Sequence, residues 1–291
     1  MNSKTVILFF IALSLAGSTV AQVIITAVGQ RFQIMPAVLP DYHTLDTTYL
    51  TVQYRYTYPC DNFKDGYELL EDDITLQVAP KKSKTFSRNL LMLDRNVTFK
   101  ENNPVKFRLD YNDFEVYNLA DESQIITNRR VPYSRLLQPS TQVIEYREKS
   151  PAIKWTQMES CDTIAGYPCL KATARVFGRN WTVWYTAEIP VMANLWKFNN
   201  LPGLILCAED ESKMFRFECT SINAAKEPVC FYEWRPVKMQ KSKWLRMEEK
   251  MHSNPKDFFL MNGEIGVINM HTREKMDGNE WHVRYCPLDM E

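Results

Sequence analysis

The feature that most constrains the fold is the alternation of side chains in the segment TTYLTVQYRYTYP, residues 47–59. Leu50, Val52, Tyr54 and Tyr56 fall on one face of an extended chain, and the residues between them are polar. A period of two indicates a β-strand with one buried face. Further strand-like segments follow along the chain, at residues 72–80, 105–119, 141–149 and 152–159. We therefore predict a mainly β protein built on a single antiparallel sheet, curved or half-barrel-like.

The segment KATARVFGRNWTVWYTAEIP, residues 171–190, predicts the clearest hairpin. Gly178 and Arg179 lie between two runs rich in β-formers. Glycine at the first central position is typical of a two-residue type II′ turn. Such a turn would pair Val176 with Trp181.

A helical insert is predicted at about residues 236–262, packed on the sheet. Pro236 suits the first turn of a helix, and Trp244, Met247 and Met251 share one face at helical spacing. A basic, amphipathic helix is also found at membrane surfaces, which is the alternative interpretation. We favour the packing of this face against the sheet.

The N-terminus has the pattern of a secretory signal peptide. Lys4 precedes an apolar run over residues 6–17, followed by small residues that end at Ala21. The run is shorter than the roughly 20 apolar residues that cross a bilayer. A buried N-terminal strand is the alternative. We expect residues 1–21 to be removed and residues 22–291 to form a single β-rich domain.

The predicted export and the amino-acid composition together restrict the cellular location of the protein and the kinds of molecule that it can bind. No cysteine lies near the cleavage point, so we expect a periplasmic or secreted protein that is neither membrane-spanning nor a lipoprotein. The 35 basic residues balance 35 acidic ones, which leaves no field to attract nucleic acid. The chain has 14 Tyr, 15 Phe and 7 Trp against 9 Gly, a composition that favours packed strands over disorder.

The chain has seven cysteines, and in an exported protein these predict disulfides with at least one thiol left over. Folding the segment around residues 223–226 as a hairpin places Cys219 opposite Cys230, within reach of a disulfide. Cys161 and Cys169 flank a second turn and form the other candidate pair. The four histidines do not fall at zinc-ligand spacings, so we expect no metal site and no cofactor.

Three segments in order carry a family resemblance: IKWTQMES (153–160), IAGYPCLKATARVFGRNWTVWYTAEIPV (164–191) and WKFNNLPGLIL (196–206). Together they resemble the GLPGLI family of Bacteroidetes exported proteins. Asn200 stands where the family name has its first glycine, and asparagine is the residue after glycine that best accepts a positive φ. The resemblance implies export and a family without an established activity, and it supplies no catalytic residues.

Candidate binding residues come from these blocks, since the aromatic ones are suited to line a ligand groove. Packing in the core explains the same side chains without a function. Glu188 is the carboxylate of most interest, although a hydrogen-bonding role explains it as well. The candidates are Trp181, Trp184, Tyr185, Glu188, Pro190, Trp196, Phe198, Leu201, Pro202, Gly203, Leu204 and Ile205.

The sequence contains no nucleophile elbow, phosphate-binding glycine loop or zinc-protease helix. We therefore expect no catalytic residues and a non-enzymatic, exported binding protein. Its expected partner is an apolar ligand or a peptide held in an aromatic-lined groove. One alternative is an interaction partner of outer-membrane machinery, such as a TonB-dependent receptor. The other is an enzyme of unrecognised type.

Overall fold

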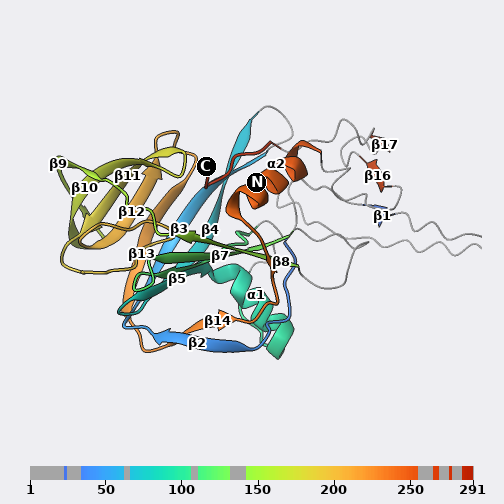
Figure 1. Ribbon diagram of the computed structural model, residues 1–291, viewed down its shortest axis with the longest axis horizontal. Helices are drawn as coiled ribbons and strands as arrows, with labels where there is room; N and C mark the ends of the chain where they lie inside the picture. Colours follow the sequence, from blue (N-terminus) through green and yellow to red (C-terminus); the bar gives the residue numbers. More distant parts are fainter. Residues whose placement is uncertain are drawn as a thin grey trace, which may run out of the picture.

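The computed structural model describes residues 34–61, 66–105, 111–131, 142–254 and 284–290, and the backbone of three short strands outside these ranges. The main sheet has twelve strands in the order β15-β8-β7-β6-β5-β4-β3-β13-β12-β11-β10-β9 (Figure 1). Its strands are β3 (Leu50–Asp61), β4 (Tyr67–Val78), β5 (Lys82–Ser87), β6 (Glu115–Leu119), β7 (Gln124–Arg130), β8 (Val143–Lys149), β9 (Thr156–Ile164), β10 (Tyr167–Val176), β11 (Arg179–Thr186), β12 (Leu204–Asp210), β13 (Arg216–Ala224) and β15 (Val237–Lys238).

Two small sheets and two helices complete the described structure. β2 (Tyr42–Thr47) pairs with β14 (Pro228–Tyr232), and β1 (Val23–Ile24), β16 (Ile265–Ile268) and β17 (Lys275–Met276) form the third sheet. The helices are α1 (Arg88–Phe99) and α2 (Lys241–Ser253), and α2 lies beside β8 (Figure 1). The prediction of a mainly β fold with a C-terminal helix on the sheet is confirmed. The prediction of a single, curved antiparallel sheet is wrong, because β15 joins β8 in parallel and two further sheets are present.

The alternation in residues 47–59 forms the long central strand β3. Val52, Tyr54 and Tyr56 are buried on its inner face, as predicted. β3 pairs along its whole length with β4, from Leu50 opposite Val78 to the far end. The paired strands β3 and β4 lie in the middle of the main sheet, and the other strands add to their two sides.

The predicted hairpin forms from β10 and β11, but its register differs from the prediction. Val176 pairs with Arg179, and Trp181 pairs with Ala174. The turn residues are Phe177 and Gly178, whose φ angles of 54° and 74° are both positive. Two positive φ angles fit a type I′ turn rather than type II′. The Phe177 ring packs edge-on against Trp196, with 4.7 Å between the ring centroids.

Helix α2 begins at Lys241 and not at Pro236, because residues 237–238 extend the main sheet as β15. The predicted apolar face is confirmed: Trp244 and Met251 are buried, and Met247 packs against the same cluster. The rest of the predicted insert, after residue 254, lies outside the described residues.

Neither predicted disulfide is formed. β13 pairs with β3 and β12, whereas β14 pairs with β2, so Cys219 and Cys230 lie in different sheets. Cys161 lies opposite Leu170 on the neighbouring strand, so it shares a face with Leu170, and Cys169 points to the other face. All four are free thiols.

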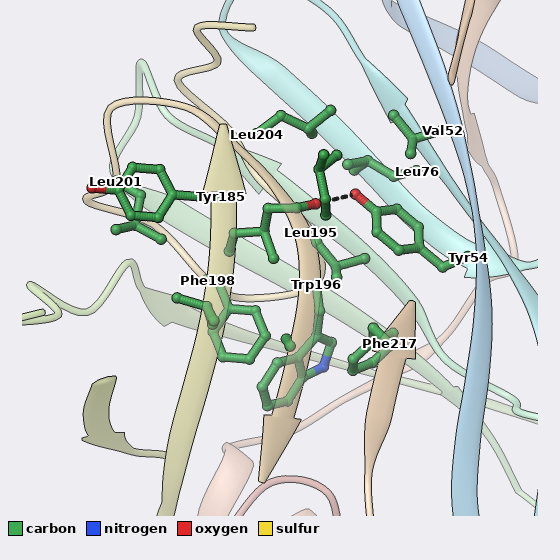
Figure 2. Packing of buried hydrophobic residues seen from close by; sticks show 14 of the residues in the cluster. Val52, Tyr54, Leu76, Tyr185, Leu195, Trp196, Phe198, Leu201, Leu204 and Phe217 are labelled. Carbon is green, nitrogen blue, oxygen red and sulfur yellow. Dashed lines mark hydrogen bonds between the residues drawn. The ribbon is translucent and has the colours of Figure 1, made fainter. Parts of the chain in front are cut away.

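The main core is shared by strands that are distant in the sheet order. Val116 of β6 and Ile125 of β7 belong to the same cluster as residues of β10 to β13. The connection between β11 and β12 passes through this core, as Figure 2 shows for Leu195, Trp196 and Phe198. The predicted signal peptide, residues 1–21, lies outside the described residues. In the part of the chain that the structure describes, no helix is long and apolar enough to cross a membrane.

Candidate functional site

Most of the candidate residues named from the sequence lie in the core. The buried ones are Trp181, Tyr185, Trp196, Phe198, Leu201, Gly203, Leu204 and Ile205. Glu188, Pro190 and Pro202 are exposed. Trp184 lies on the opposite face of the sheet, where its Nε1 donates to Asp162 Oδ2 at 2.7 Å.

The block at residues 196–206 is a tightly built turn into β12. Asn200 has a φ of 60°, the positive value expected for it from the sequence. A Cβ on Gly203 would lie 1.9 Å from the carbonyl oxygen of Thr186, so only glycine fits. The amide of Asn194 closes the turn, because its Nδ2 donates to Gly203 O at 2.8 Å and its Oδ1 accepts from Ile205 N.

A cavity of about 220 Å³ lies between β3, α2 and the segment 284–290. We call it the α2 cavity. Of the candidates named from the sequence, Trp196 lines it. Its aromatic walls come from strands, loops and α2, and include Tyr56, Tyr58, Phe114, Tyr146, Phe215 and Trp244. Aromatic walls of this kind provide flat, apolar contact area for a small organic molecule.

A buried charge cluster lies in the wall of the α2 cavity. Arg129 donates from Nε to Asp113 Oδ2 at 2.9 Å and from Nη2 to Glu248 Oε1 at 2.7 Å. Burial disfavours its charge, but the two carboxylates raise the pKa of Arg129 well above its usual value. Burial raises the pKa of Glu248, against the opposing effect of Arg129. Tyr285 donates its hydroxyl to Glu248 Oε2 at 3.0 Å.

A second cluster fastens the segment 284–290 to the sheet. Lys197, only 1% exposed at its side chain, forms ion pairs with Glu148 and Asp289. Burial disfavours its charge, but Tyr146 and these carboxylates raise the pKa of Lys197 far above its usual value. Sequence reasoning missed Lys197, although a lysine between Trp196 and Phe198 is the signal that could have found it.

Trp244 Nε1 and Thr127 Oγ1 are buried polar atoms of cavity-lining residues, and neither has a hydrogen-bond partner among the described residues. Each of these two residues is 1% exposed. Trp181 is equally buried and its Nε1 also lacks a partner in the described ranges, but Trp181 does not line the cavity. Trp181 is therefore a matched reference for Trp244.

The chain matches known proteins only among solved structures. No family model matches the chain, and no curated protein matches it. Among solved structures, it is similar to PNGF-II in space group P21, with a TM-score of 0.46 and 12% identity over 69% of this chain and 33% of that chain. The chain is also similar to PNGF-II in space group C2, with a TM-score of 0.44 and 13% identity. This match covers 68% of this chain and 32% of that chain. The chain spans about a third of the length of these chains.

The arrangement is suited to hold a small molecule against aromatic rings. In the described ranges, no three His, Cys, Asp or Glu side chains gather as they would around a metal ion. The chemical groups of the cavity-lining residues are aromatic rings and the charge cluster of Arg129.

Proposed function

We propose that the protein binds a small organic molecule, with an apolar body and a hydrogen-bond acceptor, in the α2 cavity. The observation that carries this proposal is the Trp244 indole N–H, buried in the cavity wall with no acceptor among the described residues. Buried indole N–H groups usually have a partner. Leaving one without costs about 1–3 kcal/mol, and a bound acceptor removes this cost.

The size of the cavity limits the ligand. At about 220 Å³ it exceeds a cavity of roughly 150 Å³ that binds benzene and is smaller than sites of about 300–1,000 Å³ for drug-sized ligands. The ligand is therefore a molecule of about one ring, or a branched group with a short chain.

The test is to isolate the full chain from its native source and identify bound small molecules by native mass spectrometry and solvent extraction. We expect Trp244→Phe to lose most of the bound molecule, because it removes the donor and leaves most of the ring. Trp181→Phe is the matched control and should retain it. A wild-type protein that carries no small molecule, or a Trp244→Phe protein that carries as much as wild type, would contradict the proposal.

We also propose that the chain is an exported member of the GLPGLI family, located in the periplasm or outside the cell. The family-like block supports this, since Gly203 and Lys197 hold positions that depend on their chemistry. N-terminal sequencing of the protein from fractionated source cells tests export. We expect a start near Gln22 outside the cytoplasm, and a cytoplasmic protein that retains Met1 would contradict it.

A further inference from the structure

We propose that the ligand of the α2 cavity is a small organic cation, such as an amino alcohol with a quaternary or protonated nitrogen. This inference rests on the proposed binding function and specifies its ligand. It is drawn from the balance of charges in the cavity wall, from the rings around them and from the position of Trp244 relative to Glu248.

The first observation is a surplus carboxylate. Arg129 is shared by Asp113 and Glu248, so one of these two carboxylates has no cation of its own among the described residues. The other ion pairs of the wall are balanced: Arg284 with Asp61, Arg130 with Asp94, and Lys197 and Lys241 with Glu148 and Asp289.

The negative charge of Glu248 is energetically unfavourable because this side chain is buried. Glu248 is buried, and its second oxygen accepts only the neutral hydroxyl of Tyr285 among the contacts described. A buried carboxylate without its own cation is destabilised by the loss of water. Burial accordingly raises the pKa of Glu248. A ligand cation would supply the missing charge.

The second observation is that the cavity rings already stabilise cations. The Lys197 ammonium lies 4.8 Å from the ring centre of Tyr146, Arg179 lies 4.4 Å from Phe215 and Arg129 lies 5.2 Å from Trp244. Cation–π contacts of this kind contribute about 0.5–2 kcal/mol each, more when they are buried. Phe114, over which no cation lies within the described residues, is a further ring in the wall for a ligand.

The third observation is that Trp244 and Glu248 lie on the same face of helix α2. Trp244 and Glu248 are four residues apart on α2, so their side chains are neighbours. Arg129 touches both of them. A ligand cation placed against the Trp244 ring would therefore also lie near the Glu248 carboxylate.

The test compares two molecules of nearly the same shape by calorimetric titration of the full chain. Choline carries a quaternary nitrogen and a hydroxyl, and 3,3-dimethylbutan-1-ol replaces that nitrogen by carbon. We expect choline to bind about tenfold more tightly than the neutral alcohol. Glu248→Gln should abolish this preference, so that choline and the neutral alcohol bind this variant with equal affinity. Glu218→Gln, on β13 away from the cavity, is the matched control and should keep the preference.

The outcomes separate this inference from the binding proposal. Equal affinity for both molecules in wild type, or a preference for the neutral alcohol, overturns the cation inference while ligand binding stands. If neither molecule binds and nothing co-purifies with the native protein, ligand binding itself is wrong. If circular dichroism shows that Glu248→Gln is unfolded, the affinities of wild type for choline and for the neutral alcohol still test the cation inference.

Discussion

The Nζ atom of Lys197 lies 2.5 Å from the Oδ2 atom of Asp289, although the two residues are 92 positions apart in the sequence. Lys241 Nζ approaches the other oxygen of Asp289 at 2.7 Å. One buried carboxylate therefore joins the block at residues 196–206, helix α2 and the segment 284–290. Each of these three parts of the chain contributes residues to the wall of the α2 cavity, so this contact links parts of the wall to one another.

We expect Lys197→Met to lower the free energy of unfolding by about 3–5 kcal/mol, because it leaves buried carboxylates short of a cation. Urea denaturation followed by circular dichroism measures the change. Lys243→Met is the control: Lys243 is exposed on α2, and we expect a change within about 0.5 kcal/mol. A loss in Lys197→Met as small as in this control would contradict the structural role of the ion pair.

Gly203→Ala should destabilise the protein by about 3 kcal/mol or more, because the new Cβ overlaps the backbone. That Cβ would lie 1.9 Å from Thr186 O, and a backbone atom cannot move aside cheaply. Gly166→Ala is the comparison, since its Cβ meets nothing within 4 Å and only its φ of 84° is unfavourable. We expect this second variant to lose about 1–2 kcal/mol. Thermal or urea unfolding of both variants tests the difference, and equal losses would contradict it.

The raised pKa of Glu248 predicts a specific pH dependence of stability. The groups that face this carboxyl are Arg129, Asp113 and Tyr285, with His252 one turn further along α2. Because the folded-state pKa lies above the ordinary value of 4.5, its contribution is fully present below pH 4.5. It is lost as the pH rises through the folded-state pKa.

The stability of wild type relative to Glu248→Gln should therefore fall as the pH rises above 4.5. Urea unfolding of both proteins between pH 4 and pH 8 measures this difference. Glu249→Gln, exposed on the same helix, should show no such trend. A difference between wild type and Glu248→Gln that is constant or grows with pH would contradict the prediction.

Alkylation of the native protein should distinguish its thiols. Cys161 is exposed, whereas Cys207 is buried and burial raises the pKa of its thiol to about 12. Since the thiolate is the reactive form, iodoacetamide should modify Cys161 and leave Cys207 unmodified until the protein is denatured. Peptide mass spectrometry measures both. Rapid labelling of Cys207 in the folded protein would contradict its buried position.

Local patterns in the sequence predicted local structure well. The alternation around Tyr54 and Tyr56 gave the inner face of β3, and the helical spacing of Trp244 and Met251 gave the buried face of α2. Asn200 took the positive φ expected for it. In each case the local structure depends on residues only a few positions apart, so the sequence pattern is enough to predict it.

Long-range pairing could not be predicted in this way. Residues 216–232 read as a hairpin, yet β13 pairs with β3, more than a hundred residues earlier, because that register buries Phe217 against Tyr56. The α2 cavity was missed for the same reason. Arg129 and Glu248, which form its charge cluster, are 119 residues apart, and no local pattern relates them.

The segment 284–290 also has a consequence for how the protein folds. Arg284 bonds to Asp61 across 223 residues, and Pro287 accepts from Arg179 across 108. Contacts between such distant residues form slowly, because a long loop must close before any of them is gained. We expect the α2 cavity to appear in the last steps of folding. Ligand binding should then begin during refolding only after Arg284 has formed its contact with Asp61 of β3.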